Sequence, residues 1–402
     1  MVLNDSRNFR LLWSGQFVSV IGDGMQRIAL LWWAKQRGGN GLLAVVALCS
    51  IVPVVAGSPV GGWLADRYDR RVLLVSADLL RMCTTALLAV ALLTGHGTPW
   101  LVCAVLVLSA FCTAVFDPAY AAAVPTVVEA AQLPAANGLN MANGAVGGLV
   151  GPMVGGVLIG LTGVGEVMVI NAATFMWSAV FVALTRLPRP AGASATDSER
   201  VSSREALSTV AQNRDIRRLV GLAAVLNMVV APAPLMIAAL AVDRFRTGSV
   251  GFGVLEVMVS VGLLIGSLAA GKLARGSIGT PMLVAAAALA VTGSLPLVAA
   301  AVGLVVVGVS VATTNAVVIT RFQTTVPAEV QGRVFGVVGA LGEGLRPAGL
   351  ALGPALLAVA GVSGSFIVVG VGMALATLAW ARPVATKAVP ADRLTEPVLE
   401  TA

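Results

Sequence analysis

The chain has 402 residues, of which 57% are apolar and only 11% are charged, against about a quarter charged in an ordinary soluble domain. A soluble protein of this length would need more polar surface to cover its core, so we expect a helical protein that crosses a membrane many times. The formal net charge of +7 raises the alternative of nucleic-acid binding. The basic residues lie in short loops beside apolar runs, which retention of those loops in the cytoplasm explains better, so we expect no nucleic-acid partner.

A helix needs about 20 mostly apolar residues to cross a bilayer. Breaking the chain at charges and at Gly/Pro clusters gives twelve such runs. They lie near residues 9–34, 42–64, 72–93, 100–122, 138–162, 166–187, 216–240, 250–274, 281–298, 302–325, 334–358 and 363–381. The ninth and tenth runs are the hardest to separate, because no charge falls between Arg275 and Arg321. The predicted fold class is therefore all-α integral membrane, with twelve transmembrane helices.

The distribution of basic residues predicts the orientation. Nineteen of the 26 Lys and Arg residues fall in the N-terminus, the even-numbered loops and the C-terminus, and four fall in the odd-numbered loops. Short loops rich in Lys and Arg stay in the cytoplasm, so both termini should be cytoplasmic. The polar stretch at 1–10 and the charges of Asp23 and Arg27 argue against a cleavable signal peptide.

The one long polar connection, at 188–214, divides the chain into two halves. We expect an N-terminal six-helix half at 1–187, a cytoplasmic linker at 188–214, a C-terminal six-helix half at 215–382 and a cytoplasmic tail at 383–402. Shared spacings indicate that the halves are pseudo-symmetric repeats. At an offset of 209, Lys35 and Arg37 fall on Arg244 and Arg246; at an offset of 202, Gly147-x-x-x-Gly151-Pro152 falls on Gly349-x-x-x-Gly353-Pro354. Such halves are expected where a substrate site lies between two bodies that rock against each other.

A charged turn separates the second and third runs, Gly62-x-x-x-Asp66-Arg67-x-Asp69-Arg70-Arg71. One interpretation is simple anchoring of the turn in the cytoplasm. The other is a latch between the halves, in which Asp66 accepts hydrogen bonds from the N-terminal end of a helix in the other half and Arg70 pairs with Asp117. The residues of the predicted latch are Gly62, Asp66, Arg67, Arg70, Arg71 and Asp117.

Charges within a span cost about 2.5 to 3.5 kcal/mol each at the helix centre, so they are functional candidates by default. Gln16, Asp23 and Arg27 share one face of the first span. Asp23 and Arg27 form either a structural i, i+4 ion pair, or Asp23 exchanges protons in a central cavity. Glu343 and Arg346, at i, i+3, leave the same alternatives open.

Glu256 has no opposite charge within one turn of its own helix. It would attract a cationic substrate, carry the proton, or lie at a solvated rim. The few aromatic residues and the several acids within spans lean toward an amphipathic or cationic drug as substrate, and a siderophore or an antibiotic made by the cell itself is equally compatible.

Small residues repeat along the fifth run. They are Gly147, Gly151, Pro152, Gly155 and Gly156. Close packing against another helix explains this spacing. Pro152 should also kink the helix at the interface between the halves and so help to seal one access state.

These motifs resemble the major facilitator superfamily. The turn at 62–71 resembles its loop motif between the second and third helices (Gly-x-x-x-Asp-Arg-x-Gly-Arg-Arg), with Asp69 in place of the second Gly, and the fifth run resembles the Gly-Pro motif of its exporters. Four further segments are similar to bacterial macrolide and enterobactin exporters. They are Asn8-Phe9-Arg10-Leu11-Leu12-Trp13-x-Gly15-Gln16, Asp78-Leu79-Leu80-Arg81, Phe116-Asp117-Pro118-Ala119 and Gln331-Gly332-Arg333-Val334.

The resemblance implies a monomeric secondary transporter of the bacterial inner membrane that exports a drug, antibiotic or siderophore in exchange for protons. It implies no cofactor, and neither a nucleotide-binding loop of the type Gly-x-x-x-x-Gly-Lys-Ser nor a metal-ligand spacing is present in the sequence. The alternatives are an importer of the same fold, a polytopic membrane enzyme and a sensor that transports nothing.

Overall fold

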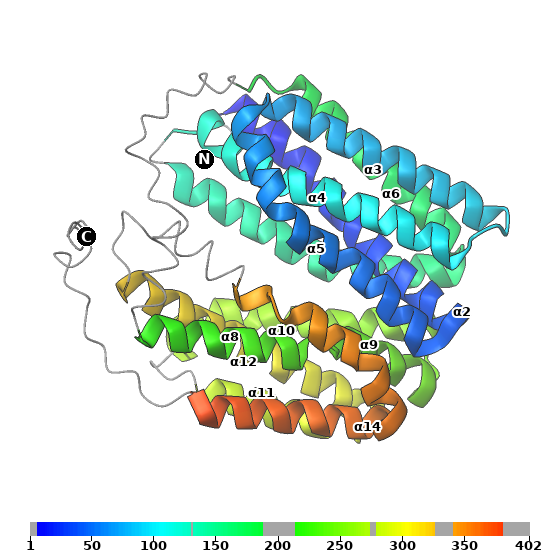
Figure 1. Ribbon diagram of the computed structural model, residues 1–402, viewed down its shortest axis with the longest axis vertical. Helices are drawn as coiled ribbons and strands as arrows, with labels where there is room; N and C mark the ends of the chain where they lie inside the picture. The colour runs from blue at the N-terminus through cyan, green and yellow to red at the C-terminus, as the bar shows by residue number, and fades with distance from the viewer. Residues whose placement is uncertain (1–5, 130–131, 188–213, 274–278, 326–340, 381–402) are drawn as a thin grey trace, which may run out of the picture.

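The computed structural model describes residues 6–129, 132–187, 214–273, 279–325 and 341–380. Every secondary-structure element in these ranges is helical, and the helices form two groups, drawn from blue to green and from green to red in Figure 1. Most of the predicted linker, the tail and the motif Gln331–Val334 lie outside the described residues.

The first group, here the first bundle, contains α2 (Arg7–Arg67), α3 (Arg70–Leu93), α4 (Pro99–Val127), α5 (Leu133–Leu161) and α6 (Val164–Leu184). The second bundle contains α8 (Arg214–Val230), α9 (Ala233–Ala239), η3 (Leu240–Arg244), α10 (Gly248–Leu273), α11 (Gly279–Thr292), α12 (Leu297–Thr325) and α14 (Arg346–Trp380). Within the described ranges, nine helices are long and apolar enough to cross a membrane, and α11 is a shorter apolar helix.

The element α2 consists of two helices joined at a break. Gly38 and Gly39 leave the helical conformation, and Gly39 has φ 59°, which glycine adopts without steric cost. Leu30 before the break and Ser50 after it line the same cavity. In a straight helix they would lie about 30 Å apart, so the chain folds back at this break.

The element α14 folds back in the same way. Gly361 interrupts it with φ 65°. Gly349 and Gly372, on either side of the break, lie against Met228 and Val229 of α8, which are adjacent in sequence. Each of α2 and α14 therefore consists of two helices that run in opposite directions within its bundle.

The predicted boundary between the ninth and tenth spans was wrong. The ninth span was expected to reach residue 298, but α11 ends at Thr292 and the N–H of Ser294 donates to the carbonyl of Val291 at 2.9 Å in the turn before Pro296. This turn carries no charge, so the charge pattern could not locate it. The seventh predicted span agrees with the candidate span Ile216–Arg244, which is interrupted between α8 and α9 at Pro232, whose nitrogen has no hydrogen to donate, and ends in the π-helical turn η3.

The glycines of α5 allow that helix to contact both bundles closely. A Cβ on Gly147 would lie 2.1 Å from Val20, and one on Gly151 would lie 2.7 Å from the Cα of Gly24, so this face packs directly on α2. A Cβ on Gly156 would lie 3.1 Å from the Cα of Gly253, so an adjacent face packs on α10 of the second bundle. Gly155 continues the α2 face, because its Cβ would lie 2.8 Å from Ile28.

We predict that Gly151→Ala lowers the unfolding free energy by about 1 to 3 kcal/mol, because the added methyl group overlaps the α2 backbone. The matched control is Gly144→Ala on the same helix, where an added Cβ meets nothing within 4 Å. Thermal unfolding of the purified protein in detergent would measure both. Equal melting temperatures for the two variants would contradict the close contact between α5 and α2.

Candidate functional site

A cavity of about 360 Å³ is lined by residues of both bundles. The first bundle contributes side chains from both arms of α2 and from α3 and α4, and the second contributes Ala231, Pro234, Arg346 and Leu350. Most of the described lining is apolar. Its charged members are Asp23, Arg27, Arg81 and Arg346.

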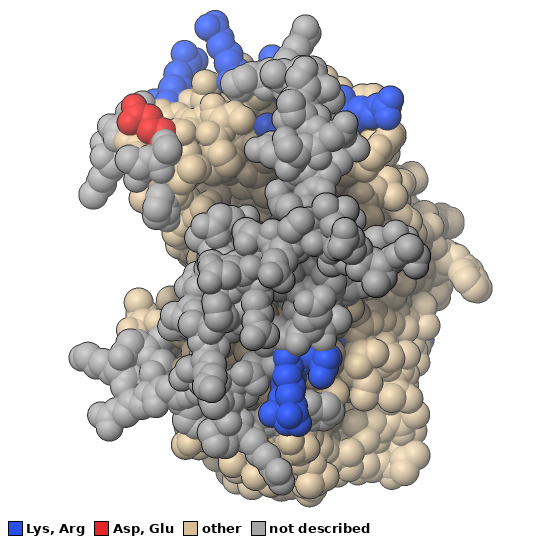
Figure 2. Space-filling view, turned by 60° about the vertical axis from the view of Figure 1, so that its left-hand side comes forward, with Lys and Arg blue, Asp and Glu red and all other residues tan. Residues whose placement is uncertain are grey.

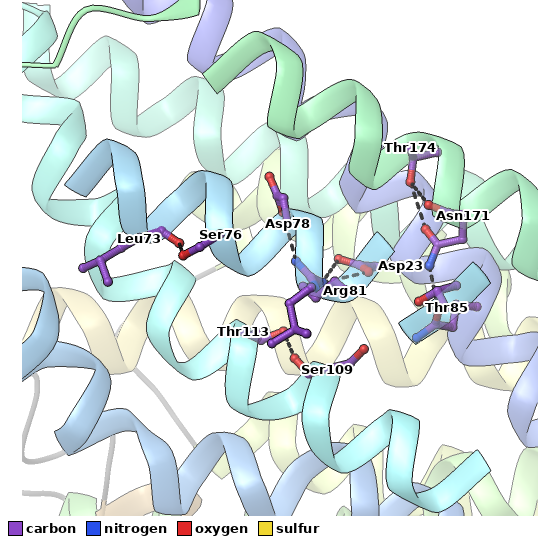
Figure 3. A network of polar contacts seen from close by, with 12 residues as sticks. Asp23, Leu73, Ser76, Asp78, Arg81, Thr85, Ser109, Thr113, Asn171 and Thr174 are labelled. Atoms are coloured by element: carbon purple, nitrogen blue, oxygen red, sulfur yellow. Dashed lines mark hydrogen bonds and ion pairs between the residues drawn. The ribbon is translucent and has the colours of Figure 1, made fainter. Parts of the chain in front are cut away.

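An ion pair between the buried Arg81 and the partly exposed Asp23 joins α2 to α3 at the cavity wall. Nη2 of Arg81 donates to both carboxylate oxygens of Asp23, at 2.9 and 2.8 Å (Figure 3). Nη1 of Arg81 lies 3.7 Å from Asp78, and its guanidinium lies 4.2 Å from the ring centroid of Phe175 on α6. Asp78 and Arg81 are both buried, so two carboxylates and an aromatic face hold one cation inside the first bundle.

The local pairing of Asp23 with Arg27 was wrong. Asp23 pairs with Arg81 instead, and Nη1 of Arg27 lies 3.0 Å from Oε2 of Glu256 on α10. Glu256, which has no partner on its own helix, therefore has one on the other bundle. Both side chains therefore pair with residues of other helices and not with each other across one turn of α2. The spacing of residues along one helix contains no information about such partners.

A second ion pair joins the bundles two turns further along α2. Nζ of Lys35 lies 2.6 Å from Oδ2 of Asp243 in η3, and it also donates to Asn40 at 2.6 Å. Nearer the middle of α5, Oγ of Ser260 donates to the carbonyl of Gly148 at 2.9 Å. These contacts and Arg27–Glu256 join the two bundles, and the two ion pairs involve the part of α2 that leads to its break.

The charged turn at 62–71 lies at the opposite end of the first bundle. Nη1 of Arg70 donates to the carbonyl of Ala122 at 2.9 Å, and Arg71 donates to the carbonyl of Ala183. The predicted pairing of Arg70 with Asp117 was therefore wrong, because the guanidinium is bound to the end of α4 beyond that acid. Arg67 lies over the ring of Trp63, 5.4 Å from its centroid. Asp66 falls in the last turn of α2, and its side chain lies outside what the structure describes.

The pair within the eleventh predicted span is confirmed. Nη1 of Arg346 lies 2.9 Å from Oε2 of Glu343, and Asn227 of α8 donates to the other oxygen of Glu343 at 3.3 Å. Gln16 is not among the described lining residues of the cavity, and its Oε1 is buried without a hydrogen-bond partner in the described part of the chain.

Sequence reasoning missed a second polar cluster beside the cavity. Oε1 of Gln26 accepts from Nδ2 of Asn171 at 2.7 Å. Thr174 donates to Oδ1 of Asn171 at 2.9 Å (Figure 3). Asn171 is fully buried. Two amides within apolar runs were the available signal, because a buried amide needs a partner. In the described ranges, no three metal-ligating side chains of the His, Cys, Asp or Glu type cluster as a metal site would require.

Residues 12–346 match the Major Facilitator Superfamily. The chain belongs to this superfamily. It is therefore a multi-pass membrane transporter and not an enzyme, and the resemblance based on the turn at 62–71 is confirmed.

Two curated relatives are efflux proteins by name. The chain is 24% identical to macrolide efflux protein A of Streptococcus pyogenes over 380 residues, which cover 90% of this chain and 92% of the relative. It is 27% identical to the multidrug efflux pump Tap of Mycolicibacterium fortuitum over 380 residues, which cover 88% and 90%.

Solved transporter structures share the fold at low sequence identity. The nucleoside transporter NupG superposes with a TM-score of 0.75 at 12% identity, covering 93% of this chain and 99% of that one. A bacterial homologue of the iron transporter ferroportin in an inward-facing state superposes with a TM-score of 0.73 at 13% identity, covering 94% and 99%.

The ion pair of Lys35 and Asp243 should respond asymmetrically to mutation. The side chain of Lys35 is buried and that of Asp243 is half-exposed. We predict that Asp243→Ala destabilises the protein by about 1 to 3 kcal/mol, because it leaves a buried ammonium group without a counter-charge and with Asn40 as its remaining partner. Lys35→Met should cost less, because Asp243 can be hydrated. Melting temperatures of the two variants and of the double variant would test this, and a larger loss for Lys35→Met would contradict it.

Proposed function

We propose that this protein exports a small organic molecule across the bacterial inner membrane in exchange for protons, by alternating access. The observation that carries the proposal is the cavity lined from both bundles, beside which two ion pairs of the described residues, Arg27–Glu256 and Lys35–Asp243, join the bundles. Such pairs exist in one access state and must break in the other, so they bias an equilibrium between two states.

Twelve spans in two pseudo-symmetric halves form part of the proposal. Two of the nine candidate spans, those in α2 and α14, each contain a glycine break at which the chain folds back, and α11 supplies one further apolar helix. This arrangement agrees with the repeated spacings at offsets of 209 and 202. The domain boundaries proposed are those of the sequence, with the linker at 188–214.

The basic residues support cytoplasmic termini. Among the described residues, more Lys and Arg than Asp and Glu side chains are visible on the side of the molecule shown in Figure 2. Hydrogen bonds place several of them together, since Arg70 and Arg71 bind the ends of α4 and α6, and the N–H of Arg186 donates to Asn8 at 3.1 Å. With this end in the cytoplasm, the pair of Lys35 and Asp243 would lie toward the outer side of the membrane.

Asp23 is the proposed proton carrier. Its side chain lines the cavity and is 35% exposed, and it is bound to a cation that Asp78 also contacts. Protonation of Asp23 would remove one carboxylate from Arg81 and loosen α2 from α3. The membrane potential supplies about 2.3 kcal/mol for each charge moved through 100 mV, which is available without a nucleotide.

The direction of transport rests on the names of the relatives and on the Gly-Pro motif. Macrolide efflux protein A and the pump Tap are named for efflux. The close approach of Gly156 to Gly253 agrees with a seal between the bundles at α5. An importer of the same fold is the alternative.

The export proposal can be tested in everted membrane vesicles energised to make their lumen acidic. A panel containing a macrolide, a siderophore and charged dyes is added, and collapse of the pH gradient by a panel member reports exchange against protons. We predict collapse with the wild type and at least about a tenfold slower collapse with Asp23→Asn, since the amide cannot release a proton.

The matched control is Glu166→Gln. Glu166 is an acid in the first turn of α6, outside the described cavity lining. If the pH gradient drives panel members only out of the vesicle lumen, the protein is an importer. If Asp23→Asn exchanges substrate for protons at the wild-type rate, Asp23 is not the proton carrier.

The latch proposal rests on Asp66 alone. We predict that Asp66→Asn slows transport several-fold, because the amide loses the charge that favours a helix N-terminus, while expression and substrate binding stay near wild type. Transport rate and equilibrium binding measured on the same preparation separate these effects. A wild-type transport rate would leave the turn with an anchoring role only.

A further inference from the structure

The described lining of the cavity contains more arginines than carboxylates, because most of the acids that pair with these arginines lie outside the lining. Three of the four charged residues in its described lining are arginines, Arg27, Arg81 and Arg346. The acids that pair with Arg27 and Arg346 are Glu256 and Glu343, and neither is among the described lining residues. A substrate in the cavity therefore meets guanidinium groups before it meets the acids that balance them.

The one carboxylate in the described lining is already occupied. Both oxygens of Asp23 accept from Arg81, whose own side chain is buried. A cationic substrate would have to displace Arg81 from both oxygens of Asp23, and charge-assisted hydrogen bonds of this kind are the strong ones.

Arg27 and Arg346 are in the opposite situation. Their side chains are 45% and 43% exposed. Each uses Nη1 for its carboxylate, and a guanidinium has five N–H donors in a planar fork. In the described part of the chain no other hydrogen bond is made by either group, so most of their donors remain available to a ligand in the cavity.

These two arginines come from different bundles, and the surface around them is apolar. Arg27 lies on α2 and Arg346 begins α14. Leu30, Ile51 and Leu350 are among the apolar side chains that share the cavity with them. The volume of about 360 Å³ lies in the range of sites for small organic ligands.

From this geometry we infer that the transported molecule is an amphipathic organic anion, with its carboxylate, sulfonate or phosphate group bound by Arg27 and Arg346 and its apolar part against the lining of α2, α4 and α14. The inference rests on the proposed transport function and argues against the cationic drug, which was one of the substrates that the sequence left open. An anion on Arg27 also competes with Glu256 for one guanidinium, so substrate binding weakens one of the ion pairs between the bundles.

Two dyes with the same xanthene body and opposite charge test the inference. The purified full-length protein in detergent is titrated with fluorescein, an anion, and with a cationic rhodamine ester, and binding is followed by fluorescence polarisation. The variants Arg27→Gln/Glu256→Gln and Arg346→Gln/Glu343→Gln each remove an ion pair without leaving a charge unbalanced. We expect fluorescein to bind more tightly than the rhodamine ester, and each double variant to lose about tenfold or more in affinity for fluorescein only.

Arg37→Gln is the control for loss of a positive charge, since Arg37 lies over Trp33 outside the described lining and should leave both affinities unchanged. Melting temperatures establish that each variant is folded. Tighter or equal binding of the rhodamine ester, binding of neither dye, or unchanged fluorescein affinity in both double variants overturns the assignment. Binding of fluorescein without movement into everted vesicles contradicts the export proposal and leaves the anion assignment standing.

Discussion

The arrangement of the first bundle depends on the buried guanidinium of Arg81. A charge at the centre of a membrane helix costs about 2.5 to 3.5 kcal/mol unless it is compensated. Asp23 and Asp78 supply opposite charge, and the ring of Phe175 covers the guanidinium face. Because these partners come from α2, α3 and α6, compensating one charge holds three helices in register and sets one wall of the cavity.

The contact between the bundles combines close packing at glycines with ion pairs, and the ion pairs form because the packing brings the helices together. Gly151 and Gly156 bring α5 against α2 on one face and α10 on another. That close approach brings α2 near α10, where Arg27 reaches Glu256 across the interface. The small residues allow the helices of the two bundles to pack closely. The ion pairs allow the bundles to separate again, because each charged group can exchange its partner for water or for a ligand.

The cavity assigns different tasks to residues of the same charge. Arg81 is buried and structural, whereas Arg27 and Arg346 are half-exposed and keep free donors. All three arginines are paired with a carboxylate, so their different tasks follow from the different exposure of their side chains. The proposed anionic substrate and the proposed proton on Asp23 would act on adjacent parts of one charge network, so binding of either would change the electrostatic environment of the other.

Composition and spacing determined that the chain is a helical membrane protein, where most spans lie and that Gly147, Gly151 and Gly155 form a packing face, because hydropathy and helical periodicity are local properties. A local pair, Glu343 with Arg346, was also predictable. The partners of Asp23, Arg27 and Arg70 were not. In a bundle, a side chain inside the membrane is surrounded by neighbouring helices, and which of them offers a counter-charge or a carbonyl depends on how the helices are rotated and crossed. Only the tertiary structure decided that Asp23 binds Arg81, that Arg27 crosses to Glu256 and that guanidinium groups face the cavity.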